Sequence, residues 1–392
     1  MSNRSLNIST TNVRKQHVLE LLCASVLAGI LIAGLWPFHA PKNDVSWLNN
    51  GNGLHFGKYG VMLGSAASSA SDWNEGTGCS IEIWLQPDHI DRGGTVLGFY
   101  SPENRIVTFS LHQSLDDLLL RRTGLYSQRN VRSKWYIEHI FGKNEEIFVA
   151  ITSNSRSTAV YVNGNLARTS PRFGLSMTDL TGQLVIGNNP IADNGWQGQL
   201  KGLAVYNREL TPAEVMQRYV AWTTHSTKEI KSENAAALYL FTEGAGNVVQ
   251  NQVDSGNYLQ IPQRYLVLHQ QFLEPPWKEF DPGWGYCKNV LINIGGFVPL
   301  GFFFCAYFSL VWRPARPVLA TIVLGAIVSL AIEVLQSFLP TRDSGVTDII
   351  TNTFGTAFGA TLYDYEHIHS LLAKTGFGGL LARGVNRNGR FR

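Results

Sequence analysis

Long apolar segments occupy the two ends of this chain of 392 residues, and a polar stretch lies between them. Residues 18–38 form the first apolar segment, and residues 286–312, 317–339 and 345–364 form three more. A helix of about 20 predominantly apolar residues spans the hydrocarbon core of a bilayer. The pattern therefore predicts four transmembrane helices, one before the polar stretch and three after it.

The polar stretch, residues 43–270, has short runs of alternating residues separated by Gly, Asn, Asp and Ser. Ser80–Leu85 alternates apolar and polar positions, and so does Ala159–Val162, which leads into Asn163-Gly164. Alternation with period two is typical of half-buried strands, and Asn-Gly is the strongest short-range signal for a tight hairpin turn. Many short strands at regular spacing predict an antiparallel β-sandwich.

Two further elements are predicted near the end of the polar stretch. A short helix is expected at residues 212–221, because Thr211 can cap it and Glu214 then completes a capping box. Residues 271–285 are rich in proline and tryptophan, which predicts an irregular linker that descends to the membrane surface.

Basic residues set the predicted orientation. They lie in residues 1–17, in the turn after the second apolar segment, and in the tail, residues 365–392. By the positive-inside rule these parts stay in the cytoplasm, so both termini are cytoplasmic and the sandwich is extracytoplasmic. A signal peptide cleaved after Ala40 is the competing interpretation. Phe38 and Pro41 beside that position favour an uncleaved anchor.

Polar residues enter the apolar segments in a regular way. Within each predicted helix they recur at steps of three or four, which places them on one stripe, and all lie toward the outer leaflet. Gly355 and Gly359 form a small-xxx-small pair that lets another helix approach closely. The candidate membrane site consists of Asn289, Asn293, Glu333, Gln336, Arg342, Asp343, Asp348 and Asn352.

Two interpretations of this cluster stay open, and no catalytic residue is assigned. A charged residue at bilayer depth costs ~2.5 kcal/mol or more, so such residues usually mark a site. In one interpretation the cluster binds or acts on a polar headgroup such as a lipid-linked sugar or phosphate. Arg342 would then hold an anionic group, with Glu333 and Asp348 as acid and base. In the other, these three residues pair only with one another and hold the helices together.

Composition narrows the function further. The net charge is +3 and no long basic run occurs, so nucleic acid is not an expected partner. The four cysteines share no zinc-type spacing, and no metal or cofactor is predicted. A glycosidase on a sandwich needs two carboxylates on one strand face, and Glu82 stands alone on its strand, so an enzyme is not favoured. Calcium in the sandwich is left open, with oxygens from Asp88, Asp116, Asp117 and Asp193.

Four motifs occur in order along the polar stretch. They are SIEIWLQP at 80–87, YVNG at 161–164, LVIG at 184–187 and the run at 196–211. In this order they resemble the laminin-G/concanavalin A-like jelly roll. The resemblance implies binding of carbohydrate or protein through loops at the edge of the sandwich. Residues 237–262 resemble an opening strand displaced to the end; they either complete the same sandwich or are a truncated second copy.

A second group of motifs lies in the apolar segments: Leu35–Phe38, Asn289–Asn293, Phe297–Phe302, Ser329–Gln336, Leu339–Arg342 and Asp348–Gly355. They resemble the VanZ-like family, named for a teicoplanin-resistance protein, across residues 286–365 together with 18–38. The resemblance implies a four-span membrane protein linked to the cell envelope. The sandwich inserted after the first span departs from the usual family pattern, and antibiotic resistance itself is not predicted.

The sequence as a whole predicts a multi-domain membrane protein. An all-β jelly-roll sandwich lies outside the cell, and an α-helical four-span bundle lies in the inner (cytoplasmic) membrane. The expected partners are the lipid bilayer and a glycan or envelope protein, in cell-envelope or surface-polysaccharide biology such as exopolysaccharide. The alternative is an intramembrane enzyme that acts on a lipid-linked envelope substrate. The ligand and the oligomeric state are left open.

Overall fold

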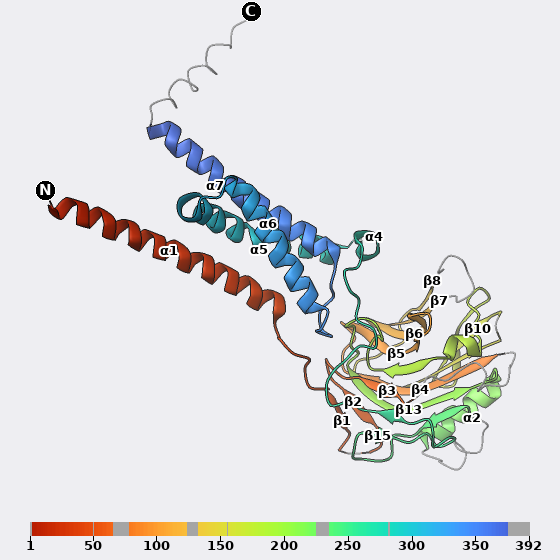
Figure 1. Cartoon of the computed structure of the whole chain (residues 1–392). Coiled ribbons are helices and arrows are strands. Elements are labelled where there is room, and N and C mark those ends of the chain that lie inside the picture. Colours follow the sequence, from red (N-terminus) through yellow and green to blue (C-terminus); the bar gives the residue numbers. More distant parts are fainter. Residues whose placement is uncertain are drawn as a thin grey trace, which may run out of the picture. The chain divides into compact units, whose positions relative to one another are not determined.

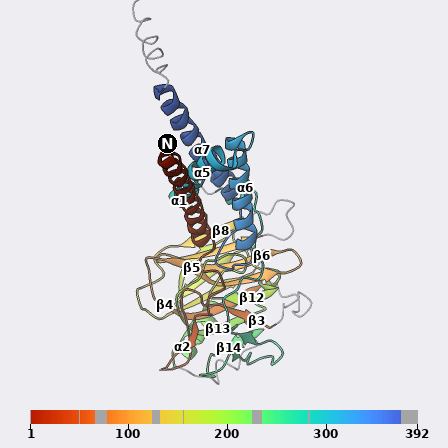
Figure 2. The same ribbon diagram turned by 60° about the vertical axis from the view of Figure 1, so that its left-hand side comes forward.

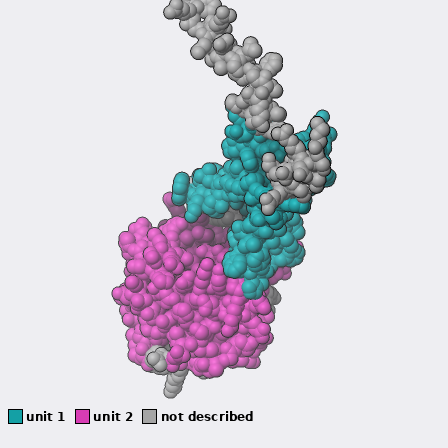
Figure 3. All heavy atoms as spheres, turned by 90° about the vertical axis from the view of Figure 1, so that its left-hand side faces the viewer, with its two compact units in different colours: residues 1–39, 271–392 teal, residues 40–270 magenta. Residues whose placement is uncertain are grey.

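The computed structural model describes residues 2–49, 51–65, 78–123, 132–154, 156–224, 235–280 and 283–374. The chain divides into two compact units, which Figure 3 colours separately. Residues 1–39 and 271–392 make the helical unit, and residues 40–270 make the sandwich unit. The sandwich is therefore an insertion in the sequence of the helical unit, after its first helix.

The helical unit is built from four long helices and one short turn of helix (Figure 1). They are α1 (Ser2–Leu35), α4 (Pro276–Glu279), α5 (Trp284–Tyr307) with its π-helical continuation Phe308–Trp312, α6 (Pro317–Gln336) and α7 (Val346–Lys374). In the described residues, three helical stretches are long and apolar enough to cross a membrane, namely Gln16–Leu35, Trp284–Trp312 and Pro317–Gln336. The fourth predicted span is a long helix, α7, but it is not among the three.

The composition of α7 explains this difference. Between Val346 and Thr361 it contains five threonines, at positions 347, 351, 353, 356 and 361, where the other helices have Leu, Ile, Val and Phe. Four of these threonines donate a hydrogen bond to the carbonyl four residues earlier, among them Thr351 to Thr347 O at 2.9 Å. Backbone carbonyls of α7 therefore accept the hydrogen bonds of its own threonine hydroxyls, and these polar residues lower its mean hydropathy.

The sandwich unit consists of two sheets in which all neighbouring strands are antiparallel (Figures 1 and 2). The first sheet has the order β1 (Val45–Trp47), β2 (Leu54–Phe56), β13 (Gly198–Tyr206), β4 (Cys79–Pro87), β9 (Ile147–Ser153), β10 (Thr158–Val162) and β11 (Asn165–Ser170), with β14 (Ala237–Tyr239) paired to β13. The second has the order β15 (Val248–Val249), β16 (Leu259–Gln260), β3 (Met62–Gly64), β12 (Gln183–Ile186), β5 (Gly93–Ser101), β6 (Ile106–Ser114), β7 (Asp117–Thr123) and β8 (Arg132–Ile137). The predicted fold class, a β-sandwich joined to a helical region, is confirmed.

The core lies between the two sheets and follows the period-two pattern. On β4, Ile81, Ile83 and Leu85 are fully buried and belong to this core. Phe109 and Leu111 on β6 reach it from the opposite sheet. Full burial of one such side chain stabilises the fold by about 1.5–3 kcal/mol. The intervening residues of β4 point to the other face of the first sheet.

That outer face is covered by α2 (Pro212–Thr223), the short helix predicted from its capping box. Thr211 accepts a hydrogen bond from Glu214 N, and the Glu214 side chain accepts one from Thr211 N, as the sequence pattern requires. Trp222 on α2 packs beside Trp84 of β4, with ring centroids 6.5 Å apart. The helix prediction is confirmed.

A buried ion pair joins α2 to the sheet. Glu82 on β4 is 0% exposed, and its Oε1 lies 3.3 Å from Arg218 Nε on α2. Trp222 Nε1 and Tyr206 OH also donate to Glu82 Oε2, at 2.9 and 3.1 Å. Burial raises the pKa of the Glu82 carboxyl, and the Arg218 charge and these hydrogen bonds act against that rise. Glu82 therefore positions α2, a role its isolation in the sequence did not reveal.

Two further predictions can be compared with the sheets. Asn163 and Gly164 form the turn between β10 and β11, with φ of 48° and 79°, so the hairpin is confirmed. Residues 237–262 complete the same sandwich, because β14 pairs with β13 while β15 and β16 extend the second sheet next to β3. The alternative of a truncated second copy is therefore wrong.

Candidate functional site

The predicted polar stripes meet where α7 begins. Asn293 on α5 donates from Nδ2 to Asp348 Oδ1 in the first turn of α7, at 2.7 Å. One turn further along α7, Asn352 donates from Nδ2 to Ser329 Oγ on α6, at 2.9 Å. These two hydrogen bonds tie α7 to both of its neighbours. Amide and hydroxyl pairs of this kind hold helices together where water is excluded.

Two glutamates bind the amino end of α7. Glu333 on α6 is 1% exposed and accepts a hydrogen bond from Gly345 N at 2.8 Å. Glu279, the last residue of α4, accepts from Thr347 N at 3.1 Å and also from the Thr347 hydroxyl. The first N–H groups of a helix have no partner within it, and its amino end carries partial positive charge. Both carboxylates are therefore well placed to stabilise the start of α7.

Arg342 and Gln336 bind the carboxyl end of a helix, namely α1. Gln336 Nε2 donates to Gly34 O at 2.8 Å, and an Arg342 guanidinium nitrogen donates to Trp36 O at 2.7 Å. Both carbonyls lie at the carboxyl end of α1, where carbonyl groups lack helical partners and a cation is favoured. These bonds fasten the end of α1 to the end of α6 and to the loop that follows it.

The remaining predicted residues lie at the margin of the cluster. Asn289 and Asp343 are both exposed. The structure thus brings Asn293, Asp348, Asn352 and Glu333 to the start of α7, while Gln336 and Arg342 face the end of α1. Six of the eight predicted residues therefore form two groups of contacts near helix ends.

Gly355 and Gly359 lie where α7 crosses α5. A Cβ atom on Gly355 would lie 2.2 Å from Ile294 O, and one on Gly359 would lie 2.0 Å from Val298 O. Gly301 on α5 makes the reciprocal contact, since its Cβ would lie 2.1 Å from Thr356 O. The backbones of the two helices therefore touch, which requires glycine at these positions.

Sequence reasoning missed several residues of this region. Gly301 was not singled out, and neither was Gly325 of α6, where a Cβ would lie 2.3 Å from Thr356 Oγ1. Small residues within apolar helices are the signal that could have found both. Glu279 was also missed, because it lies in the predicted linker. That linker instead contains α4 and pairs with the α7 start, with Glu274 N donating to Ser344 O at 3.0 Å.

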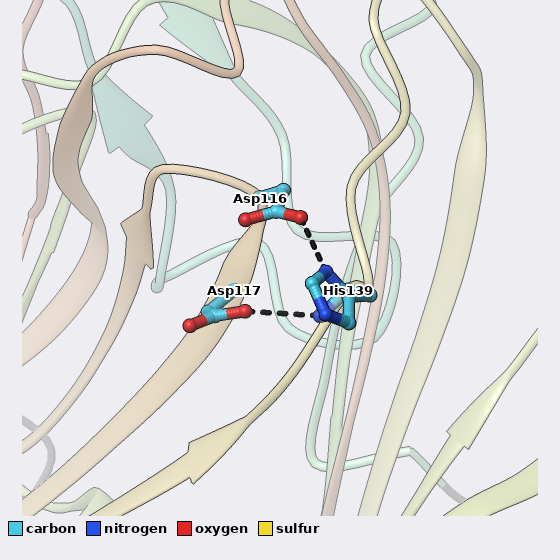
Figure 4. A group of neighbouring side chains, drawn as sticks. All are labelled: Asp116, Asp117 and His139. Carbon is cyan, nitrogen blue, oxygen red and sulfur yellow. Dashed lines mark hydrogen bonds and ion pairs between the residues drawn. The ribbon is translucent and has the colours of Figure 1, made fainter.

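Two carboxylates and a histidine of the sandwich unit, Asp116, Asp117 and His139, lie close enough together to be considered as a metal site (Figure 4). Asp116 Oδ2 lies 2.6 Å from His139 Nδ1, and Asp117 Oδ1 accepts from His139 N at 2.9 Å. The hydrogen bond with Asp116 raises the pKa of His139 and lowers that of Asp116. Asp193 in turn accepts from Tyr265 OH at 2.6 Å. Calcium prefers six to eight oxygen ligands, and the group of Asp116, Asp117 and His139 offers two carboxylates, so it does not fit a calcium site.

Comparison with known proteins identifies both parts of the chain. A VanZ/LLP1 family model matches residues 216–368, and a model of the concanavalin A-like lectin/glucanases superfamily matches residues 63–216. The chain joins a VanZ-like segment to a concanavalin A-like segment. Both resemblances stated from the sequence are therefore confirmed. The VanZ-like match begins in α2 and includes the last strands of the sandwich unit, upstream of the 286–365 region expected for it. No curated protein matches the chain.

Comparison with solved structures finds similar chains at low identity. The SAP-like pentraxin from Limulus polyphemus is 15% identical with a TM-score of 0.33, covering 58% of this chain and 95% of that one. The IT-sialidase CBM40 of Ruminococcus gnavus, bound to alpha2,3 sialyllactose, is 12% identical with a TM-score of 0.33, covering 43% and 96%. The receptor binding domain of botulinum neurotoxin D is 13% identical with a TM-score of 0.32, covering 47% of each chain. This chain thus spans less than half of the neurotoxin domain.

Proposed function

We propose that this chain is an integral protein of the inner membrane that holds its concanavalin A-like sandwich outside the cell, where the sandwich binds a glycan or a protein of the cell envelope. The bundle of α1, α5, α6 and α7 is the anchor. The two family matches support the combination of parts, and the bundle geometry supports the arrangement.

The observation that carries the proposal is the attachment of the end of α1 to the end of α6. Gln336 and Arg342 bind carbonyls of Gly34 and Trp36, so these two helices end at the same face of the bundle. The Asn293–Asp348 bond brings the starts of α5 and α7 to one level of the bundle as well. The chain leaves for the sandwich after α1 and returns before α5. Both connections to the sandwich therefore belong on the membrane face that carries the α6–α7 loop.

The distribution of basic residues supports an outward orientation of that face. The loop between Trp312 and Pro317 contains Arg313 and Arg316, and it lies at the opposite ends of α5 and α6. Under the positive-inside rule this loop belongs in the cytoplasm, together with the amino terminus. In this arrangement α7 is the fourth span despite its low hydropathy. Its packing against α5 through Gly355 and Gly359 supports that role, because its polar groups then face protein.

Binding by the sandwich is tested with the full chain and a variant that lacks residues 45–270, each reconstituted in nanodiscs. Both are exposed to arrays of envelope polysaccharides and envelope proteins. We expect the full chain to retain a ligand and the deletion variant to lose it. Equal retention by both, or no retention by the full chain, would contradict the proposal.

An intramembrane enzyme is the second candidate, and the gathering of carboxylates at the start of α7 is the observation that favours it. Glu333, Asp348 and Glu279 all lie there, beside the outward-facing end of the bundle. Each already accepts a hydrogen bond from a neighbouring element, which favours the structural role. Glu333→Gln keeps the shape of the side chain, so an envelope phenotype lost at normal protein level would favour chemistry. Glu366→Gln, the same change at an exposed position near the other end of α7, is the matched control.

A further inference from the structure

A hollow of about 590 Å³ opens on the outer face of the first sheet, beside α2. Pockets for small ligands usually measure roughly 300–1,000 Å³ and combine aromatic walls with a few polar groups. This hollow lies in the sandwich unit, and neither Asp116, just before β7, nor His139, just after β8, lines it. Its walls come from β4, β9, β13, α2, the β1–β2 loop and the β10–β11 turn.

Aromatic rings form the inner wall. Trp84 points away from the core because its neighbours Ile83 and Leu85 point into it. Phe148 of β9 lies beside Tyr219 of α2, with ring centroids 5.9 Å apart. Phe148 is 1% exposed and Trp84 is 8% exposed, whereas Tyr219 is only partly buried. Tyr219 therefore offers the largest accessible aromatic face.

Polar groups form the rim. Lys201 Nζ lies over the Trp84 ring, 5.7 Å from its centroid, and pairs with Glu146. Asn52 is exposed in the β1–β2 loop. Asn163 accepts from Phe148 N through Oδ1 at 3.0 Å, which fixes its amide at the edge of the hollow. The rim thus holds two amides, one ammonium and one carboxylate.

This combination of groups identifies the class of ligand. The C–H face of a sugar ring packs on an aromatic face, while hydroxyls donate to and accept from amides and charged groups. The Lys201–Glu146 pair has no net charge, so the hollow lacks the excess of cations that would select an acidic sugar or a phosphate. One carboxylate is also too few for a metal ion.

We propose that this hollow, with Tyr219 as its stacking face and Asn52 and Asn163 at its rim, binds an uncharged oligosaccharide. The inference rests on the proposed glycan-binding function and assigns it to the face beside α2, whereas the jelly-roll resemblance points to loops at the edge of the sandwich.

The test uses the full chain in nanodiscs and isothermal titration calorimetry. The probes are four neutral hexasaccharides, namely cellohexaose, maltohexaose, mannohexaose and chitohexaose, and a hexagalacturonate as the acidic counterpart of equal length. We expect at least one neutral probe to bind more tightly than hexagalacturonate. Tyr219→Ala should then weaken its Kd roughly five- to tenfold, since it removes the stacking face.

Val220→Ala is the matched control, because Val220 is the next residue of α2, is 47% exposed and does not line the hollow. It should leave the Kd unchanged within about twofold. In case Tyr219→Ala disturbs α2, Asn52→Ala provides a second variant, in a loop, with Asn49→Ala, exposed in the same loop and outside the lining of the hollow, as its control. Asn52→Ala should weaken binding about threefold, the loss of roughly one hydrogen bond.

Three results would overturn the inference: no neutral probe binds, hexagalacturonate binds best, or both Tyr219→Ala and Asn52→Ala bind as the wild type does. In the last case glycan binding stands and its site lies elsewhere, so the inference fails while the proposed function survives. The proposed function is tested separately, by comparing the full chain with the variant that lacks residues 45–270.

Discussion

Replacing Gly359 by alanine tests the close contact of α5 and α7. The added Cβ atom would lie 2.0 Å from Val298 O, whereas real Cβ contacts essentially never fall below 3.0 Å. The two backbones would therefore have to separate by about 1 Å. Overpacking of this kind costs about 1–3 kcal/mol. The higher helix propensity of alanine offsets about 0.5–1 kcal/mol of that cost. We expect a net loss of about 1–2 kcal/mol, and a similar loss for Gly355→Ala.

The matched control is Gly296→Ala in α5. A Cβ on Gly296 would meet nothing within 4 Å, so this variant gains helix propensity without a clash. The assay is unfolding by SDS in mixed micelles, followed by circular dichroism at fixed detergent composition. Gly359→Ala and Gly355→Ala should unfold at lower SDS fraction than the wild type, and Gly296→Ala at the same or a higher fraction. If all three variants shift together, α5 and α7 do not touch at these glycines and the reasoning is refuted.

Three other predictions concern single interactions. Arg218→Met should destabilise the sandwich by about 3–5 kcal/mol, because it leaves the buried carboxylate of Glu82 without its cation. The double variant with Glu82→Leu should recover most of that loss. Both are measured by denaturant unfolding followed by near-UV circular dichroism. The NMR titration of His139 should give a pKa above its ordinary 6.5, and Asp116→Asn should return that pKa toward 6.5. The contribution of the His139–Asp116 pair to the stability of the fold is therefore present at low pH and lost as pH rises through the raised pKa. Arg342→Ala should lower the SDS unfolding midpoint by an amount equivalent to about 0.6–1.7 kcal/mol, since it removes a hydrogen bond from the end of α1; an unchanged midpoint would contradict that attachment.

Local patterns predicted the sandwich well. The capping box at Thr211 and the Asn163-Gly164 turn depend on groups within a few residues of one another, so the sequence alone contains the needed information. Glu82 is the counterexample. Its three partners lie more than 120 residues further along the chain, and only the fold brings them together.

In the helical unit, spacing predicted which residues share a stripe but not which stripe meets which helix. Asn293, Asp348 and Asn352 bond across helices as steps of three and four suggest. Gly296 lies only three residues after Asn293, yet it is exposed, while Gly301 makes the close contact with α7. The rotation of α5 about its axis is set by packing, and a short periodic pattern does not determine it.

The arrangement of the chain across the membrane is tested most directly by cysteine accessibility in intact spheroplasts. The four native cysteines are replaced, and a single cysteine is placed at Leu166, 58% exposed in the sandwich, or at Arg316, in the loop before α6. We expect a membrane-impermeant maleimide to label Leu166→Cys in intact spheroplasts and Arg316→Cys only after permeabilisation. Protection of Leu166→Cys together with labelling of Arg316→Cys would place the sandwich inside the cell and contradict the account.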